Sequence, residues 1–365
     1  MPLVSVILTS FNYGKYIREA IDSVLAQTFK DFELIIWDDA SDDNSWEIIN
    51  SYSDRRIKKF RNESRRRANW GVNKAISEIA SGKYLADQHS KNSWEPDKLA
   101  KQVKFLDEHH GTGAVFTNAL IIGEDGAPLS YASPFYSNIF DQTNRTRHEW
   151  LNFFLVQGNA LCHTSVLIRK ECYDNCGLYR LDIAQLPDLD MWMRLCLKYE
   201  IHVLPEKLTR YRLFSNETNT SGSRPDSRIR STNEFYILLK NYLAIESFDE
   251  LAAIFPEGAK YYRAGGFDFK FVFAMLLLEK ETYIFEKLFA IDLLFEAMAD
   301  PVRSQSIKAL YDFDYQDLIK LTGKVDCFST ENLHAGLEAI KSTLSWRITH
   351  PLRVVKAVYN RITGS

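Results

Sequence analysis

Apolar runs and helical repeats alternate along the first 125 residues. Short runs of strand length lie at 3–9, 32–37, 57–60, 83–88 and 115–122. Between them, segments with apolar residues three and four positions apart lie at 14–27, 43–51, 69–80 and 95–108. The first spacing is typical of buried strands and the second of amphipathic helices. The alternation therefore predicts an α/β domain in which a mainly parallel central sheet carries helices on both faces.

The pattern changes to continuous helical spacing near residue 225. Residues 161–213 still show short strand and helix units. The helices expected after them are 229–245, 247–254, 267–280, 282–299 and 303–323. We therefore predict three parts: a first domain over 1–222, a helical domain over 223–340 and a C-terminal tail over 341–365.

The tail is basic and amphipathic. Its cations are Lys341, Arg347, Arg353, Lys356 and Arg361, and it contains no Asp or Glu. The residues Leu352, Val355, Tyr359 and Ile362 fall on one helical face. Such a helix is typical of proteins that lie on membrane surfaces. Residues 346–363 are thus expected either to touch the membrane peripherally or to dock on the chain's own helical domain.

Composition limits the partners and the compartment. The net charge of −3 argues against a nucleic-acid binder. The five cysteines are odd in number and lack zinc-knuckle spacing, which favours a reduced, cytoplasmic protein. Because Met1 runs directly into a predicted strand, we expect no signal peptide. The longest run without Lys, Arg, Asp or Glu, 150–168, includes polar residues and makes a poor membrane span.

Polar residues follow three of the predicted strands at their carboxyl ends. They lie at 9–12, 38–41 and 87–91. Ligands of parallel sheets bind beyond the carboxyl ends of the strands, so we expect these three segments to form one site.

Several ordered motifs resemble the start of family-2 inverting glycosyltransferases. The motifs lie at 4–12, 21–29, 32–43, 82–84, 94–99 and 188–192. The resemblance covers about residues 3–215. It implies the GT-A fold of nucleotide-diphospho-sugar transferases and the transfer of a sugar from a nucleotide donor to an acceptor hydroxyl. Members of this family usually need Mg²⁺ or Mn²⁺.

The resemblance also implies residues on the donor side. Thr9 and Phe11 would border the nucleobase, and Asp39 would accept a hydrogen bond from a base N–H, which suits a UDP or dTDP donor. Asp38 is either a ligand contact or a satisfied turn residue. Arg67 lies where the family often contacts the base or a phosphate, and its alternative is a solvated loop charge.

On the acceptor side, Asp188 matches the family's catalytic base. A carboxylate that removes the proton of the attacking hydroxyl typically contributes about 10²–10⁴-fold. Asp190 either braces the site or caps the helix that begins there. Trp94 is expected to form a wall of the acceptor pocket or to lie in the core, and His163 to lie near the acceptor or to be a buried, hydrogen-bonded histidine.

The chain departs from the family where the metal ligands usually lie. Alignment on 94–97 places His89, Ser90 and Lys91 at the usual Asp-x-Asp pair. A Tyr-Arg-x-His motif that often supplies a further ligand reads Tyr, Arg, Leu, Phe at 211–214. Lysine is a compact charge that binds phosphate. We therefore predict no metal cofactor, with Lys91 at the diphosphate and His89 either at a phosphate or filling the loop.

An alternative to this metal-free hypothesis is a new metal site at Asp87 and His89, although hard cations prefer several oxygen ligands.

The main hypothesis for the function is a metal-independent, inverting transferase that builds a surface glycan of the O-antigen or capsule type. Its acceptor would be a glycan or a lipid-linked glycan at the inner membrane face. The competing hypothesis is an inactive, transferase-like subunit that binds nucleotide sugars or glycans. A nucleotidyltransferase is less supported, because no Gly-rich phosphate loop follows the first strand.

Overall fold

The computed structural model describes residues 1–129, 138–214, 222, 224–264, 266–280 and 283–343. It forms two compact units, Met1–Pro256 and Glu257–Ser365. The division thus lies later in the chain than the predicted boundary at 222. Residues just after that boundary bond back to the first unit: Glu234 accepts hydrogen bonds from the backbone of 184–186, and Tyr242 donates to the carbonyl of Leu151.

The first unit is built on a sheet whose strand order is β3-β2-β1-β4-β7-β6-β8-β5 in the described chain. The strands are β1 (Val4–Ser10), β2 (Phe32–Asp38), β3 (Ile57–Arg61), β4 (Tyr84–His89), β5 (Ser93–Trp94), β6 (Thr112–Ile122), β7 (Leu167–Arg169) and β8 (Glu200–Arg212). Pairs β1–β2, β1–β4, β2–β3 and β6–β8 are parallel, whereas β7 and β5 run antiparallel to their neighbours. The predicted α/β fold with a mainly parallel sheet is confirmed.

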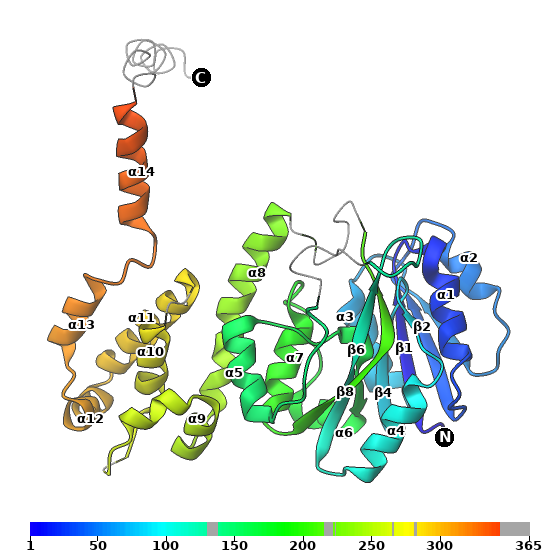
Figure 1. The fold of residues 1–365 in the computed structure, drawn as a ribbon, viewed down its shortest axis with the longest axis horizontal. Helices are drawn as coiled ribbons and strands as arrows, with labels where there is room; N and C mark the ends of the chain where they lie inside the picture. Colours follow the sequence, from blue (N-terminus) through cyan, green and yellow to red (C-terminus); the bar gives the residue numbers. More distant parts are fainter. Residues whose placement is uncertain (130–137, 215–221, 223, 265, 281–282, 344–365) are drawn as a thin grey trace. The chain divides into compact units, whose positions relative to one another are not determined.

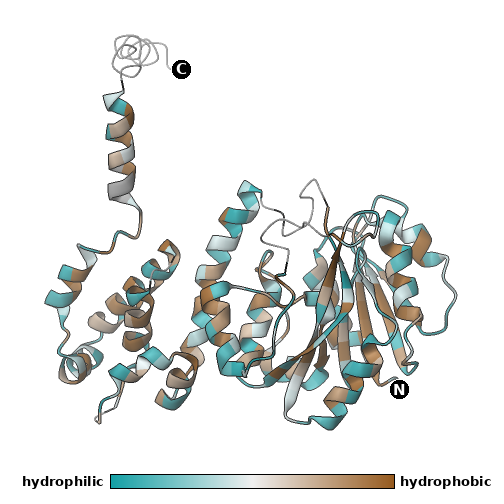
Figure 2. Ribbon diagram, in the orientation of Figure 1, coloured by the Kyte–Doolittle hydropathy of each residue, from teal (hydrophilic) through white to brown (hydrophobic). Residues whose placement is uncertain are grey.

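The first unit also contains helices. They are α1 (Gly14–Leu25), α2 (Ser45–Asn50), α3 (Ala68–Lys74) with the π-helical turn η1 (Ala75–Ile79), α4 (Lys98–Glu108), α5 (Arg147–Gln157), the 3-10 turn η2 (His163–Ser165), α6 (Lys170–Cys176), α7 (Pro187–Cys196), α8 (Pro225–Leu238), the 3-10 turn η3 (Leu239–Ala244) and α9 (Phe248–Ile254). Of these, α1 and α4 pack against the sheet, whereas α8 and α9 lie away from it (Figure 1). Figure 2 shows apolar residues concentrated on the central strands. All seven residues of β1 and of β2 are buried, as expected for strands covered on both faces.

Strand register brings the predicted site segments to one level of the sheet. Thr9 of β1 pairs with Trp37 of β2 and with His89 of β4, and Ser10 pairs with Asp38. The three strands therefore end together, and the segments that follow them start from the same edge.

The second unit is helical, as predicted. After the 3-10 turn η4 (Pro256–Tyr261), its helices are α10 (Phe269–Glu279), α11 (Ile284–Ala299), α12 (Pro301–Tyr311), α13 (Tyr315–Thr322) and α14 (Thr330–Ser342). The single helix predicted over 303–323 is wrong. Asp312 adopts a left-handed conformation (φ 54°) that ends α12, and the Asp314 side chain caps α13 by accepting a hydrogen bond from the Gln316 backbone.

Among the described helices, none combines the length and the apolar character needed to cross a bilayer. The tail residues 346–363, for which a membrane contact was predicted, lie outside the described residues.

Candidate active site

Asp38, at the end of β2, is a satisfied turn residue. Its Oδ1 accepts a hydrogen bond from the Ser41 hydroxyl (2.6 Å), and its Oδ2 accepts one from the Ser41 backbone N–H (2.9 Å). The Arg61 guanidinium lies 3.5 Å from Oδ2. Of its two predicted roles, the turn role accounts for this residue.

Asp39 holds the loop between β3 and α3. Its Oδ1 accepts hydrogen bonds from the Asn62 side chain and the Arg66 backbone, and its Oδ2 accepts one from the Arg67 backbone, each of 2.7 Å. Asp39 is only 4% exposed, so the carboxylate is part of the frame of the site. Its predicted contact with a nucleobase stays a prediction.

Arg65 contacts the predicted base-binding residue Phe11, and the predicted donor contact of Arg67 stays a prediction. The Arg65 guanidinium lies 4.1 Å from the centroid of the Phe11 ring, a cation–π contact. Arg67 immediately precedes α3 with φ 71°, a conformation rare for residues other than glycine. Thr9, at the base of the same segment, is buried. Sequence reasoning missed Arg65 because three consecutive arginines are equivalent until the loop path is known.

Lys91 lies in the loop between β4 and β5 with 8% of its surface exposed. Its ammonium nitrogen is 5.2 Å from the ring centroid of Tyr211 and 5.6 Å from that of Phe214. Burial lowers the pKa of Lys91 to about 8, so the side chain is still mostly charged at neutral pH. Lys91 and Phe214, which lie in different motifs of the sequence, thus meet in space.

Arg212 fixes the backbone of the Lys91 loop. Its Nε donates to the carbonyl of Lys91 (3.0 Å), and its backbone N–H donates to the Asn92 side chain (3.0 Å). The rest of its guanidinium bonds the carbonyl of Gly123 (2.9 Å) and the carboxylate of Glu19 (2.5 Å). Because Arg212 is 1% exposed, it anchors the loop from inside the protein.

Asp188 is in the first turn of α7, directly after the proline that begins this helix. Its Oδ2 accepts a hydrogen bond from the Asn159 side chain (2.8 Å), and its Oδ1 accepts one from the Leu189 backbone (2.9 Å). Burial raises the pKa of Asp188, and the nearby His163 partly opposes that rise. A carboxylate with a raised pKa is a stronger base, which suits the predicted proton removal.

Asp190 braces α7 and does not cap it. Its Oδ2 lies 2.9 Å from Arg194 Nη2, and its Oδ1 accepts a hydrogen bond from the Asn241 side chain (3.0 Å). The N-cap position belongs to Leu186, which has no side-chain cap. The capping alternative is therefore wrong, and the predicted role in bracing the site stays a prediction.

Trp94 belongs to the hydrophobic core. It is 4% exposed, its indole N–H donates to the carbonyl of Thr164 (2.9 Å), and the Lys98 ammonium lies 3.9 Å from its ring centroid. The first of its predicted roles, a wall of the acceptor pocket, is corrected in favour of the second, because the ring is enclosed by protein.

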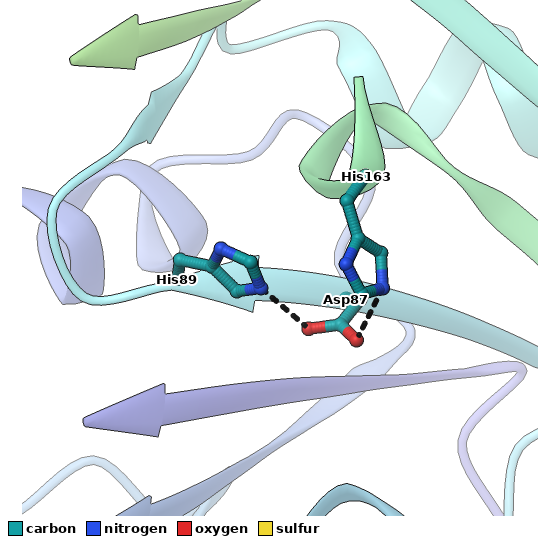
Figure 3. A group of neighbouring side chains, drawn as sticks. All are labelled: Asp87, His89 and His163. Carbon is teal, nitrogen blue, oxygen red and sulfur yellow. Dashed lines mark ion pairs between the residues drawn. The ribbon is translucent and has the colours of Figure 1, made fainter. Parts of the chain in front are cut away.

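His89 and His163 face Asp87 (Figure 3). The Nε2 atom of His163 lies 3.2 Å from Asp87 Oδ2, and the Nε2 atom of His89 lies 3.9 Å from Asp87 Oδ1. One donor atom from each residue lies within 4.8 Å of the others. Burial lowers the pKa of His89 to about 4, so its ring is neutral. Burial also depresses the pKa of His163, but the Asp87 carboxylate outweighs it, and the net pKa is raised.

The connector between α5 and β7, residues 158–166, joins these groups. Its Asn159 bonds Asp188, its His163 faces Asp87, and its Thr164 accepts a hydrogen bond from the Asn92 side chain (3.2 Å). One short segment thus holds the predicted base, the imidazole cluster and the Lys91 loop. Sequence reasoning named only His163 here, because amide and hydroxyl side chains carry no signal of their distant partners.

The hard cations usual in the family do not suit this donor set. The cluster of Asp87, His89 and His163 offers one carboxylate and two imidazoles, whereas Mg²⁺ and Ca²⁺ prefer oxygen ligands. Mg²⁺, one of the ions usual in the family, therefore lacks a matching set of oxygen ligands among these three residues.

A family model described as "Glycosyl transferase family 2" matches residues 5–169. The putative glycosyltransferase EpsE of Bacillus subtilis is 30% identical over 198 residues, which are 53% of this chain and 66% of that protein. The putative teichuronic acid biosynthesis glycosyltransferase TuaG of the same organism is 31% identical over 224 residues, 60% of this chain and 82% of that protein. An Escherichia coli protein, UDP-Glc:alpha-D-GlcNAc-diphosphoundecaprenol beta-1,3-glucosyltransferase WfaP, is 37% identical over 107 residues, 29% of this chain and 42% of that protein.

Among solved structures, that of S. aureus TarS 1–349 in complex with UDP-GlcNAc is similar to this chain. The TM-score is 0.54 at 20% sequence identity, and the match covers 84% of this chain and 81% of that one. At this level of identity, the likeness shows a shared fold.

Proposed function

The chain belongs to glycosyl transferase family 2, and from that premise we propose that it moves a sugar from a nucleotide-diphosphate donor, of UDP or dTDP type, to a hydroxyl of a surface-glycan acceptor. The transfer inverts the configuration at the anomeric carbon. The donor class is supported by TarS, solved with UDP-GlcNAc, and by WfaP, whose name specifies UDP-glucose. The acceptor class is supported by TuaG, named for teichuronic acid biosynthesis, and by WfaP, named for a diphosphoundecaprenol-linked acceptor.

The observation that carries the proposal is the setting of Asp188. Its carboxylate is oriented by Asn159 and its pKa is raised by burial. In the proposed step, the acceptor oxygen attacks C1 of the sugar while Asp188 takes the hydroxyl proton. The bond from C1 to the diphosphate oxygen breaks on the opposite face, and the nucleoside diphosphate leaves with the bonding electron pair.

Lys91 would stabilise that leaving group. An ammonium ion held at the diphosphate offsets the charge that develops as the bond breaks, and it acts strongly where water is excluded. The burial of Lys91 among Tyr211 and Phe214 supports such a role. We therefore propose that the transfer needs no metal cofactor.

We also propose a place of action. A lipid-linked acceptor would bring the protein to the cytoplasmic face of the inner membrane, where it would be a peripheral protein. The basic residues of 346–363 would then interact with the acidic lipid surface.

Donor turnover in the presence of EDTA tests the proposal. The assay measures release of UDP or dTDP from a panel of nucleotide sugars, with and without a glycan acceptor. We expect activity that survives EDTA and falls at least 100-fold in Lys91→Met. The matched control is Lys104→Met, because the Lys104 side chain is 74% exposed and lies on α4 away from the loop.

Two results would contradict parts of this proposal. Activity that requires added Mn²⁺ would contradict the proposed metal independence but would still support the proposed transferase activity. Tight binding of nucleotide without turnover of any donor would instead support the inactive, ligand-binding subunit.

A further inference from the structure

We propose that Asp87, His89 and His163 bind a divalent transition-metal ion of the Zn²⁺ class. This ion would differ in kind, in ligands and in role from the Mg²⁺ or Mn²⁺ that the family usually holds at the diphosphate. The proposal does not rest on the proposed transfer reaction, because it concerns binding by three side chains that already face one another (Figure 3).

The spacing of the donor atoms suits a tetrahedral ion. Metal–ligand bonds of about 2.1 Å place neighbouring donors of a tetrahedral site about 3.4 Å apart. The observed separations are 3.2 Å from His163 Nε2 to Asp87 Oδ2 and 3.9 Å from His89 Nε2 to the other oxygen, Asp87 Oδ1. With one donor atom taken from each residue, all three donors lie within 4.8 Å of one another, so the site must contract to hold the ion. A small rotation of the His89 ring, whose side chain is 31% exposed and can move, would complete the geometry.

The surroundings of the Asp87 carboxylate also indicate a bound ion. Asp87 is 4% exposed, and among the described residues neither of its carboxylate oxygens accepts a well-directed hydrogen bond. A buried carboxylate without hydrogen-bond donors is costly, since the facing imidazoles and the charge of Lys98 replace its lost hydration only in part. A bound dication would satisfy both the charge and the lone pairs of Asp87.

The chemistry of the set selects the class of ion. Two imidazole nitrogens and one carboxylate oxygen are typical ligands of Zn²⁺ and related first-row ions, whereas Mg²⁺ prefers an all-oxygen octahedron. Three protein ligands leave a fourth position for water or a ligand oxygen, as in open zinc sites.

Two features oppose binding and limit the affinity. His163 Nε2 also lies 3.0 Å from the Tyr179 hydroxyl, a contact that must be given up when this nitrogen binds an ion. The Tyr173 hydroxyl, 3.4 Å from that of Tyr179, offers a replacement partner. The positive charges of Lys91 and Lys98 act on this cluster and favour a moderate affinity over a very tight one.

Titration of the full-length, metal-free chain with Co²⁺ tests the proposal. Four-coordinate Co²⁺ has a visible absorption that reports its geometry, and Zn²⁺ added afterwards should displace it and abolish that absorption. We expect one such site per chain, competition by Zn²⁺, and no competition by a large excess of Mg²⁺. Displacement by Mg²⁺ as readily as by Zn²⁺ would overturn the assignment.

Substitution of the proposed ligands tests whether the ion binds at these three side chains. His163→Gln and Asp87→Asn should weaken Co²⁺ binding by more than about 100-fold, the upper end of the loss seen when an outer-shell partner is removed. His110→Gln is the control, because His110 is an exposed surface residue. His89→Gln is the further ligand variant least expected to disturb folding, and unchanged Co²⁺ binding in it would overturn the three-ligand site.

Co²⁺ binding and the transfer assay test the two proposals independently. Site-specific Co²⁺ binding together with transfer that survives EDTA supports both proposals. Site-specific binding together with transfer that EDTA abolishes and Zn²⁺ restores would support the metal site and contradict metal-independent transfer. Loss of all transfer in every condition would leave the Co²⁺ measurement to decide the metal site by itself.

Discussion

Asn159 donates a hydrogen bond of 2.8 Å from its side-chain nitrogen to Oδ2 of Asp188, which lies 29 positions further along the chain. The orientation of the proposed base therefore depends on the connector 158–166 as well as on α7. Because the same connector carries His163 and Thr164, a change in its path would disturb the base and the Lys91 loop together.

Replacement of Asp188 by Asn should strongly reduce sugar transfer and leave donor binding unchanged. We expect kcat to fall about 10²–10⁴-fold, because the amide cannot accept the acceptor proton. The affinity for UDP, measured by calorimetry, should stay within about twofold. Asp182→Asn is the control, since the Asp182 side chain is 72% exposed. Full activity of the Asp188 variant would show that another group is the base.

Removal of the Asn159 side chain should leave Asp188, the proposed base, less well oriented. In Asn159→Ala we expect kcat to fall about tenfold with little change in KM for the donor, since a hydrogen bond to a charged group contributes about 1.5 kcal/mol. Asn50→Ala, at an exposed position at the end of α2, serves as the control. A change confined to KM would argue that Asn159 acts on substrate binding instead.

Replacement of Arg212 by Met should destabilise the protein and the Lys91 loop. The variant leaves buried carbonyls of Lys91 and Gly123 without their donor, which costs about 3 kcal/mol in the free energy of unfolding. Denaturant unfolding measures this loss, and UDP affinity should fall in parallel. Arg210→Met, whose side chain is 44% exposed, should change stability by less than about 0.5 kcal/mol. Equal effects of the two variants would contradict the anchoring role.

Lys98 should make the stability of the fold depend on pH. Burial lowers its pKa to about 7 in the folded chain, whereas the unfolded side chain titrates at its usual value of 10.5. Below pH 7 both states hold the proton and the fold bears the full cost of a buried charge. Between pH 7 and 10.5 only the unfolded chain holds it, so stability rises with pH.

Lys98→Met tests this dependence. The variant should be more stable than the wild type by about 2–3 kcal/mol at pH 6, after allowance for the lost hydrogen bond to Gln102. That advantage should shrink steadily when urea unfolding is repeated up to pH 9. A difference between the two proteins that does not vary with pH would contradict the shifted pKa of Lys98.

Gly82 should tolerate no side chain. A Cβ atom there would lie 2.5 Å from the backbone nitrogen of Ser5 and 2.8 Å from the carbonyl carbon of Val4, both in the central strand. We expect Gly82→Ala to cost about 3 kcal/mol in thermal or denaturant unfolding, the upper range for overpacking. Gly111→Ala, where nothing lies within 4 Å of the added carbon, should be nearly neutral. Similar stabilities of the two variants would show that β1 and the turn before β4 are not packed so tightly.

Hydrophobic periodicity alone determined the fold class and the edge of the sheet at which the site lies. Apolar runs such as 3–9 and 32–37 can be buried only in a covered sheet, and parallel strands must end at a common edge. The motifs around Asp188 and 94–99 indicated the family through local spacing, which folding leaves unchanged. These features are short-range properties of the chain, so they can be read without coordinates.

The tertiary structure alone decided which side chains meet. Arg65 lies over Phe11, Trp94 contacts Thr164 and Lys98, and Asp190 pairs with Arg194 and Asn241. These outcomes depend on loop paths and on contacts between distant segments. A residue type states what a side chain can bond but not where the chain will carry its partner, and for that reason the convergence of His163 on Asp87 had no signal in the sequence.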